Sequence, residues 1–305
     1  MNHLFESLKD KKIIIAGCNG YIGNAFAELL FSKNVKFTGI DKIDNVGAKP
    51  FSYNNFNLTN ENELDKLISS VKPDIFFHFA THSALAYKND FLKSFDDDYL
   101  SLKNIVQSLL KLRNTKLIYF SSSYVYSSLD SSEVVNEETV LRPKHNFGFG
   151  KSFFETMIQK TMNKYIIFRL SSVFGEGNYI HGNAIENLVK EAVSKKNIYI
   201  WGKGERKMQY VYIKDVINCL SQIELMPSGI YNLCSNDYDS INSTAKIIAD
   251  YFNADTTNLI EKNEGETLPE MDNQKIKSII GLDFFWDHSE SMLDYLNNVK
   301  KVENE

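Results

Sequence analysis

Residues 13–23 read Ile-Ile-Ile-Ala-Gly-Cys-Asn-Gly-Tyr-Ile-Gly, an apolar run followed by three glycines spaced three positions apart. The run predicts a buried strand, and the apolar spacing from Ile22 to Leu30 predicts one face of a helix. Glycine permits a tight turn and the close approach of another backbone, while a helix start offers unpaired N–H groups and the positive end of a dipole. This strand, turn and helix therefore predict a site for a pyrophosphate.

An acidic residue, Asp41, ends the next apolar run. A carboxylate at that place accepts hydrogen bonds from ribose hydroxyls and repels a 2′-phosphate. We therefore expect a dinucleotide cofactor and favour NAD over NADP, with the adjacent Lys42 softening the repulsion. A tight turn without a ligand is the alternative.

Short apolar runs alternate with amphipathic segments over the first 170 residues, the pattern of βαβ units around a parallel sheet. The runs lie at 13–15, 35–40, 75–79, 117–120 and 166–170, and the helical spacings at 22–30, 64–71, 102–110 and 149–158. Near-continuous apolar strands are buried on both faces. We therefore predict an α/β fold, a doubly wound parallel Rossmann-type sheet, with a smaller, partly interleaved C-terminal lobe after residue 174.

Composition excludes several classes of protein. The 305 residues are 43% hydrophobic and 24% charged, with a formal net charge of −5, which is typical of a globular protein and not of a nucleic-acid binder. Three scattered cysteines and six histidines without ligand spacing predict neither a disulfide framework nor a metal site. No secretory signal or membrane-length apolar stretch is present in the sequence, so we expect a cytoplasmic protein without a membrane partner.

Further segments resemble the extended short-chain dehydrogenase/reductases that act on nucleotide sugars, the NAD-dependent epimerase/dehydratase family. Besides the glycine loop, residues 73–80 resemble the family's fourth strand, and Ser-Ser-Ser-Tyr-Val-Tyr at 121–126 resembles its S-S-x-x-V-Y segment. Residues 169–175 are similar to R-x-x-N-V-Y-G, with Ser172 in place of the Asn, and residues 201–216 to the late glycine and V-Y-V-x-D-V segment. The similarity runs over nearly the whole chain.

This resemblance implies NAD as cofactor, a nucleotide sugar as substrate, and a homodimer built on two helices at about 99–112 and 148–162. The cofactor contacts that it implies are Gly17, Asn19, Gly20, Tyr21, Ile22, Gly23, Asp41, Asn57, Leu58, Phe79, Ala80, Thr81 and Lys151. The substrate contacts that we assign are Ser123, Tyr124, Ser172, His181, Arg206 and Lys207. We expect residues 1–175 and about 206–240 to form the NAD-binding domain, and about 176–205 and 241–305 the nucleotide-sugar-binding lobe.

The family's catalytic Y-x-x-x-K motif departs from its pattern here, because residues 147–151 read Phe-Gly-Phe-Gly-Lys. In the family the Tyr moves the proton of the sugar oxygen, and the Lys, here Lys151, holds the nicotinamide ribose and lowers the pKa of that Tyr. The resemblance makes Ser122 the catalytic serine, but Phe147 has no group to titrate. General acid/base groups contribute on the order of 10²–10⁴-fold to rate, so we expect impaired activity.

Three explanations for Phe147 stay open. A deliberate Tyr-to-Phe substitution would keep the ring and trap substrate. A natural pseudo-enzyme would bind NAD without catalysis. Another group, Tyr124, Tyr126 or His145, would supply the proton by a shifted geometry.

The reaction is narrowed by the residues after Ser122. Dehydratases of the family carry an Asp-Glu pair where this chain has Ser123 and Tyr124, which disfavours dehydration. Oxidoreduction at C4 remains, by a 4-epimerase-like or 4-dehydrogenase enzyme. A 4-keto reductase of the GDP-fucose-synthase type is the alternative; it would use His181 but has a Cys where Tyr124 stands. Arg206 and Lys207 lie just before the position of the family's nucleotide-binding Arg.

Overall fold

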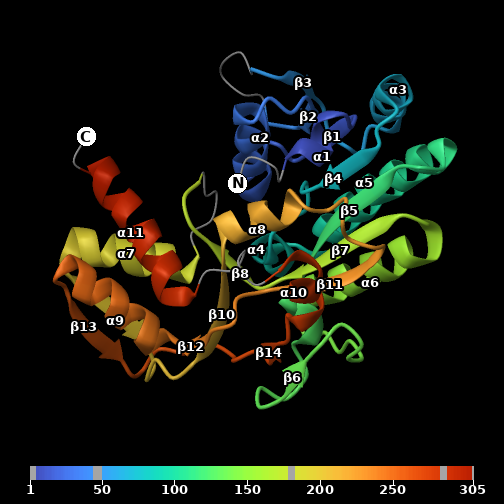
Figure 1. Cartoon of the computed structure of the whole chain (residues 1–305). Helices are drawn as coiled ribbons and strands as arrows, with labels where there is room; N and C mark the ends of the chain where they lie inside the picture. Colours follow the sequence, from blue (N-terminus) through green and yellow to red (C-terminus); the bar gives the residue numbers. More distant parts are fainter. Residues whose placement is uncertain (1–4, 44–49, 178–182, 282–286, 304–305) are drawn as a thin grey trace. The chain divides into compact units, whose positions relative to one another are not determined.

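The structure, a computed structural model, describes residues 5–43, 50–177, 183–281 and 287–303 (Figure 1). The chain divides into two compact units. The first comprises Met1–Ser128, Val140–Arg169 and Ile217–Tyr231, and the second Leu129–Thr139, Leu170–Val216 and Asn232–Glu305. These units are defined by how compactly their residues pack and not by what they bind. The division into an NAD-binding domain and a nucleotide-sugar-binding lobe therefore stays a prediction.

A seven-stranded parallel sheet has the order β11-β7-β5-β4-β1-β2-β3, which confirms the predicted α/β class. Its strands are β1 (Ile13–Ala16), β2 (Thr38–Asp41), β3 (Ser52–Asn55), β4 (Ile75–His78), β5 (Lys116–Ser122), β7 (Tyr165–Leu170) and β11 (Gly229–Leu233). The chain adds strands on one side of β1 as far as β3 and then on the other side from β4 onward. In such sheets, ligands bind outside the carboxyl ends of the strands where the order reverses, here between β1 and β4.

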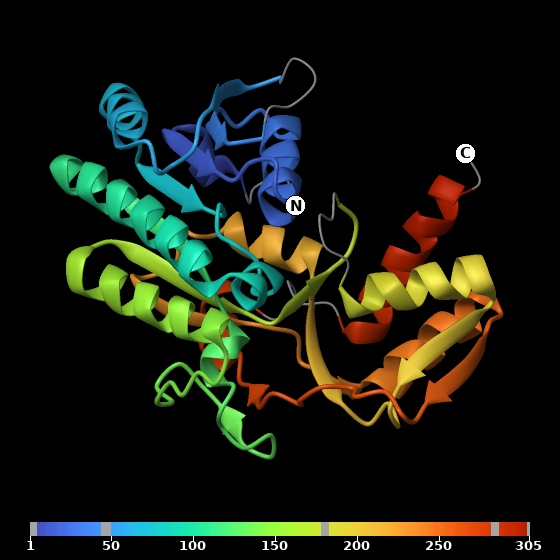
Figure 2. The ribbon, with the colours of Figure 1, turned by 180° about the vertical axis from the view of Figure 1, so that it is seen from behind.

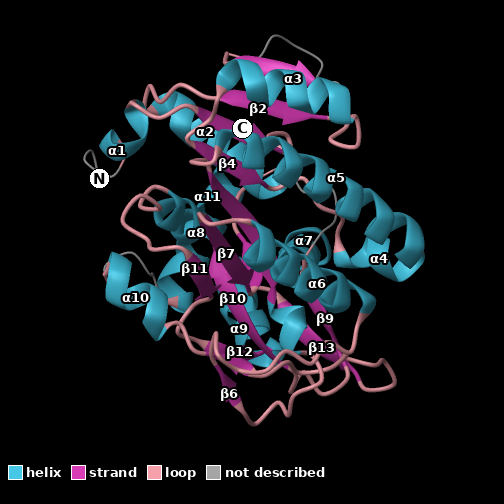
Figure 3. Cartoon of the chain, turned by 90° about the vertical axis from the view of Figure 1, so that its right-hand side faces the viewer, coloured by secondary structure: helices cyan, strands magenta, loops and turns pink. Residues whose placement is uncertain are grey.

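Helices cover both faces of this sheet. On one face, Phe26 of α2 (Tyr21–Ser32) packs on Phe77 of β4, with ring centroids 4.7 Å apart. The other face carries α3 (Glu61–Val71), α5 (Phe91–Leu112) and α6 (Asn146–Thr161). Figure 3 shows the strands between α2 and the pair α5 and α6, and Figure 2 shows α5 and α6 side by side. The alternation read from the sequence thus corresponds to a doubly wound arrangement.

Local capping explains where two of these helices begin. The Asn60 side chain accepts a hydrogen bond from the Glu63 backbone N–H at 3.3 Å and donates one to the Glu63 carboxylate at 2.6 Å. Asp90 caps α5 in the same way, accepting from the Lys93 N–H at 3.1 Å. Each cap satisfies one of the N–H groups that a helix start leaves without a partner.

The register of the strands brings the predicted cofactor residues together. Ala16 at the end of β1 lies opposite Ile40 of β2 and His78 of β4. The residues that follow, among them Gly17 and Asp41, therefore emerge at the same edge of the sheet.

The second unit contains short sheets and several helices. Parallel β9 (Asn197–Trp201) and β13 (Asp255–Leu259) form one sheet, β12 (Tyr238–Ser240), β10 (Lys207–Tyr212) and β8 (Ser172–Phe174) another, and β14 (Glu270–Met271) and β6 (Val134–Val135) a third. Its helices include α7 (Ala184–Lys195), α9 (Ile241–Phe252), α10 (Gln274–Ile280) and α11 (His288–Glu303). Over the described ranges of the chain, no helix is long and apolar enough to cross a membrane.

Candidate active site

The glycines between β1 and α2 stand where side chains have no room. Gly17 has a φ of +83°, and a Cβ on it would lie 2.6 Å from the Ala80 backbone nitrogen. A Cβ on Gly23 would lie 2.1 Å from the Gly17 carbonyl oxygen, so α2 packs on the end of β1 only because residue 23 is glycine. Gly20 precedes α2 without a side-chain cap. The positive end of the α2 dipole thus lies at this glycine turn, where it favours an anion.

Asp41 ties this loop to the end of β2. Its side chain is 8% exposed, and its carboxylate accepts hydrogen bonds from the backbone N–H groups of Asn19 at 2.9 Å and Ile43 at 3.1 Å. The Asn19 amide in turn donates to the Tyr53 hydroxyl at 3.1 Å. Two predicted cofactor residues, Asn19 and Asp41, are therefore hydrogen-bonded to each other at the carboxyl ends of β1 and β2.

One pocket at the carboxyl ends of β1, β2 and β4 gathers most of the predicted cofactor residues. Those that line it are Gly17, Gly20, Asp41, Asn57, Leu58, Phe79, Ala80 and Thr81. The predicted Asn19, Tyr21, Ile22 and Gly23 belong to the same loop and the first turn of α2. The pocket also has lining residues that sequence reasoning did not assign to the cofactor: Ile40, Lys42, Ile43, Phe56, His82, Asp97, Asp98 and Ser101.

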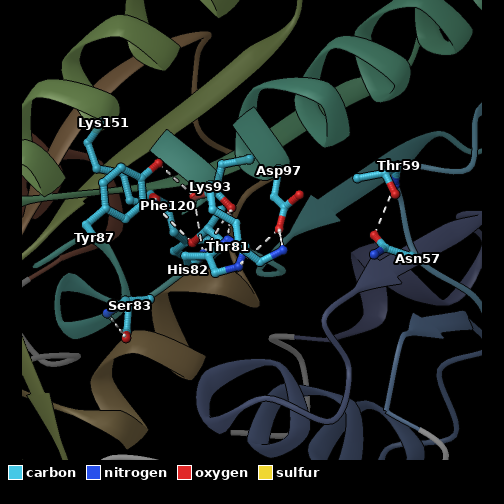
Figure 4. A network of polar contacts seen from close by, with 12 residues as sticks. Asn57, Thr59, Thr81, His82, Ser83, Tyr87, Lys93, Asp97, Phe120 and Lys151 are labelled. Carbon is cyan, nitrogen blue, oxygen red and sulfur yellow. Dashed lines mark hydrogen bonds and ion pairs between the residues drawn. The ribbon is translucent and has the colours of Figure 1, made fainter. Parts of the chain in front are cut away.

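Asp98 of α5 is the centre of a polar cluster that sequence reasoning missed. It is 4% exposed and accepts hydrogen bonds from the His82 backbone N–H at 3.1 Å, from His82 Nδ1 at 2.8 Å and from the Tyr87 hydroxyl at 3.0 Å. Figure 4 labels His82 and Tyr87, the two residues that donate these hydrogen bonds. The only signal in the sequence is a run of three aspartates at 96–98 inside an apolar helix pattern. Asp98 thus holds α4 (Ala84–Asn89) and the loop after β4 against α5.

Lys151 lies next to Thr81 of this pocket. It is 3% exposed, and its Nζ donates to the Phe120 carbonyl at 2.8 Å, the Thr81 hydroxyl at 3.0 Å and the Tyr119 hydroxyl at 3.4 Å (Figure 4). Burial lowers the pKa of Lys151 to about 8, against the opposing effect of the Asp98 and Glu155 charges. The Lys151 side chain is thus held beside Thr81, which lines the pocket.

Phe147, in the first turn of α6, presents a ring without a polar atom to this region. The Lys151 Nζ lies 5.4 Å from the centroid of the ring, and the rings of Tyr87 and Tyr124 contact it edge-on at centroid distances of 5.5 and 5.9 Å. A Cβ on Gly150 would lie 2.8 Å from the Tyr87 ring. The small residue at 150 therefore leaves room for Tyr87 beside α6.

Ser122 and the three proposed substitutes for the missing phenol have different surroundings. Ser122 ends β5, and its Oγ accepts from the Tyr124 N–H at 3.3 Å in the short helix η1 (Ser123–Tyr126). Tyr124 and His145 are half-buried and in ring contact, with centroids 5.4 Å apart. Tyr126 is fully buried, and its hydroxyl accepts from Arg169 at 2.6 Å.

The network around Tyr126 is saturated. Arg169 also forms a buried ion pair with Glu155, at 2.7 Å between Nη2 and Oε2, and Glu155 accepts from the Ser121 hydroxyl. Removing Tyr126 from this network to reach a substrate would leave the buried Arg169 short of a partner, which is costly. The arrangement therefore disfavours Tyr126 as the proton-transferring group.

The predicted substrate residues fall in both units. Ser123 and Tyr124 lie in η1 of the first unit, and Ser172 begins β8 of the second unit, half-buried. His181 lies outside the described residues. The remaining two are Lys207, which begins β10, and Arg206, which directly precedes it.

Arg206 and its neighbour Lys207 differ in their surroundings. Arg206 lines a pocket of about 520 Å³ in the second unit, together with residues of α7 and with Trp201, which is 58% exposed. It donates to the Glu264 carbonyl at 3.1 Å, and its buried Nε has no hydrogen-bond partner among the described residues. Lys207 is exposed, with its Nζ 5.3 Å from the Tyr238 ring centroid, and does not line that pocket. Arg206 is thus the better placed of the two for a phosphate.

A family model matches this chain, and it describes the NAD dependent epimerase/dehydratase family; the match covers residues 13–234. The chain belongs to this family. Its cofactor is NAD, as the sequence predicted, and the cradle at Gly17 and the carboxylate of Asp41 fit that dinucleotide.

Curated relatives are distant. The chain is 22% identical over 236 residues to Protein CapI of Staphylococcus aureus, covering 72% of this chain and 70% of that protein. It is 25% identical over 239 residues to a UDP-glucose 4-epimerase of Mycoplasma genitalium, covering 68% of this chain and 69% of that protein.

Solved structures share the fold. A UDP-glucose 4-epimerase of Thermotoga maritima, crystallised with UDP-glucose, superposes with a TM-score of 0.85 at 16% identity, over 95% of this chain and 99% of that chain. A dTDP-glucose 4,6-dehydratase of Bacillus anthracis in complex with NAD gives 0.82 at 17% identity, over 96% and 97% of the two chains.

Proposed function

We propose that this protein uses NAD to oxidise and reduce a nucleotide sugar at C4, as a 4-epimerase-like or 4-dehydrogenase enzyme whose rate is limited by Phe147. The observation that carries the proposal is the continuity from the glycine cradle to the catalytic motif: the pocket that Gly17 and Asp41 line is also lined by Thr81, whose hydroxyl accepts a hydrogen bond from Lys151. Lys151 in turn lies over the ring of Phe147.

Each of these groups has a task that its chemistry supports. The start of α2 attracts the pyrophosphate, and Asp41 accepts from the ribose hydroxyls. Lys151, fixed by three oxygens, orients the nicotinamide ribose, and Ser122 hydrogen-bonds the reacting sugar oxygen. Bound NAD supplies the hydride acceptor and donor. The hydroxyl that would exchange a proton with the sugar oxygen is the part that Phe147 lacks.

The nucleotide end of the substrate is assigned to the second unit. Arg206 offers a guanidinium fork for phosphate oxygens, and the exposed Trp201 ring in the same pocket offers a surface for a base. The UDP-glucose bound in the Thermotoga maritima epimerase supports a nucleotide sugar as the substrate class. Ser123 and Tyr124 stand in place of the dehydratase pair, which supports C4 chemistry over dehydration.

The test compares the protein with its Phe147→Tyr variant, each with NAD and a panel of UDP-, GDP-, CDP- and dTDP-sugars followed by proton NMR. We expect the Tyr variant to convert one of the sugars about 10²-fold or more faster, because a phenol returns to the position that it holds in the family's Y-x-x-x-K motif. The absence of conversion by either protein, with NAD bound to both, would contradict the proposal.

A second candidate is a non-catalytic protein that binds NAD, and the observation that favours it is again Phe147. Such a protein needs no nucleotide-sugar pocket. Calorimetric titration of the NAD-bound protein with the same panel separates the two: saturable binding that weakens in Arg206→Ala supports the enzyme, and no binding of any sugar nucleotide supports the non-catalytic protein.

A further inference from the structure

Three polar side chains lie against the ring of Phe147, and each is a candidate for the proton transfer that this ring cannot perform. They are Tyr87 and Tyr124, both edge-on to the ring, and Lys151, whose Nζ lies 5.4 Å from its centroid. Their hydrogen bonds and burial distinguish them.

Tyr87 and Lys151 are committed to other partners. Tyr87 is 1% exposed, and its hydroxyl donates to the buried Asp98 carboxylate at 3.0 Å. Burial, helped by the Asp98 charge, raises the pKa of Tyr87 well above its ordinary value, so this phenol keeps its proton. Lys151 is 3% exposed and directs its three N–H bonds at three protein oxygens. Neither group is placed to exchange a proton with a sugar.

Tyr124 is half-buried, and its backbone makes two close contacts, one with Ser122 at the end of β5 and one with Gly148 in α6. Its N–H donates to the Ser122 hydroxyl at 3.3 Å. Its carbonyl oxygen approaches Gly148 so closely that a Cβ there would lie 2.2 Å away. The side chain of Tyr124 also contacts His145, and the centroids of the two rings lie 5.4 Å apart. The ring of Tyr124 therefore contacts the rings of His145 and Phe147, and its backbone is bound to Ser122, the serine that we assign to the reacting sugar oxygen.

We propose that Tyr124 exchanges the proton of the C4 oxygen in this protein, in place of the phenol that Phe147 lacks; the inference rests on the proposed function. In reduction, C4 gains a hydride from the nicotinamide, and the C4 oxygen takes the phenol proton, which leaves a Tyr124 phenolate. In oxidation, C4 loses hydride to the oxidised nicotinamide, the hydroxyl proton returns to the phenolate, and the C4=O double bond forms.

The test is a double-mutant cycle of Tyr124→Phe and Phe147→Tyr, with hydride transfer measured as NADH formation in a single turnover. In the native background, we expect Tyr124→Phe to lower the rate by about 10²-fold, the usual effect of removing a general acid/base. In the Phe147→Tyr background, we expect a change of less than about threefold, because the phenol at 147 replaces it. Tyr165→Phe, which removes a half-buried hydroxyl at the start of β7, is the matched control and should leave the rate unchanged.

The outcomes separate a failure of the inference from a failure of the proposed function. An equal loss in both backgrounds would mean that Tyr124 only supports the structure, and would overturn the inference. The inference would also be overturned if Tyr124→Phe left the native rate unchanged, or if activity appeared only in proteins that carry Phe147→Tyr. In these cases the proposed function stands. If none of the four proteins transfers hydride while all bind NAD, the proposed function fails and the inference with it.

A binding measurement without NAD gives a second readout. Each protein is titrated with the nucleotide sugar of the panel that binds most tightly and with its 4-deoxy analogue. If the Tyr124 hydroxyl contacts the C4 oxygen, Tyr124→Phe weakens binding of the parent sugar by about 3- to 10-fold, the effect of one lost hydrogen bond, and leaves the 4-deoxy analogue unchanged. Equal effects on both sugars would overturn the inference.

Discussion

At the residue scale, the carboxylate of Asp41 should decide the choice between NAD and NADP. It lines the cofactor pocket with Lys42 beside it, and a 2′-phosphate would face its negative charge. We expect NAD to bind more tightly than NADP in direct titration. The Asp41→Asn substitution should lower the affinity for NAD by about tenfold and reduce the difference in affinity between NAD and NADP. Tighter binding of NADP by the unaltered protein would contradict this assignment.

His78 should make the fold sensitive to acid. It is fully buried in β4, neither of its ring nitrogens has a hydrogen-bond partner in the part of the chain that the structure describes, and burial lowers its pKa from 6.5 to about 4. Between these pH values the unfolded chain binds a proton that the folded chain does not, so the free energy of unfolding falls as the pH falls.

Denaturant unfolding of the protein and of His78→Phe measures this effect. We expect the unaltered protein to lose roughly 3 kcal/mol more than the variant between about pH 7 and pH 4, the equivalent of the pKa shift of His78. Identical pH dependence in the two proteins would show that His78 does not contribute.

At the scale of elements, the turn between β1 and α2 should tolerate no side chain at its first glycine. Gly17→Ala places a Cβ 2.6 Å from the backbone of Ala80 at a φ of +83°. We expect a loss of at least about 2 kcal/mol in unfolding free energy and a loss of NAD binding.

Gly229→Ala, at the start of β11, is the matched control for this turn. Its Cβ would meet nothing closer than 3.5 Å, so we expect a change within about 1 kcal/mol. If thermal unfolding and NAD titration gave the same result for both variants, the close approach of Gly17 to Ala80 would not be what fixes the loop.

The elements that sequence reasoning found are those with a strong apolar period. The runs at 13–15, 75–79 and 166–170 became β1, β4 and β7, and the helical spacing at 64–71 falls within α3. By contrast, β3 reads Ser-Tyr-Asn-Asn at the edge of the sheet, where no buried face imposes an apolar pattern, and it was not predicted. The first half of α5 was also missed, because three aspartates interrupt its apolar spacing.

In the candidate site, too, sequence reasoning found the local features and missed those that depend on long-range packing. The glycine loop is local in sequence, so its geometry could be predicted from residues 13–23 alone. The cluster of His82, Tyr87 and Asp98 depends on the packing of α4 against α5, and Lys151 meets Thr81 across 70 positions. No local pattern encodes such contacts, because they exist only once the helices have packed on the sheet.

At the scale of the whole molecule, α5 and α6 should carry the contact of a homodimer. Phe149 and Phe153 are 48% and 42% exposed, and both contact Phe95, beside the partly exposed Tyr99. Clustered exposed aromatics of this kind mark interaction surfaces, and a twofold pairing of the same helices would bury them.

Sedimentation of variants tests this surface. We expect the native mass to be that of a dimer and Phe153→Glu to give a monomer, because a charge at the contact would be buried without a partner. Leu225→Glu, at a site that is 65% exposed and lies outside both helices, should leave the mass unchanged. A native monomer, or a Phe153→Glu dimer, would contradict the predicted interface.

The hydrogen at C4 of the sugar is the most direct label for the proposed oxidoreduction. The Phe147→Tyr variant is incubated with NAD and a nucleotide sugar deuterated at C4, and the reduced cofactor is analysed by mass spectrometry. Our account predicts that the deuterium is found in the reduced cofactor. Reduced cofactor without deuterium would show that the hydride leaves another carbon, and would contradict oxidoreduction at C4.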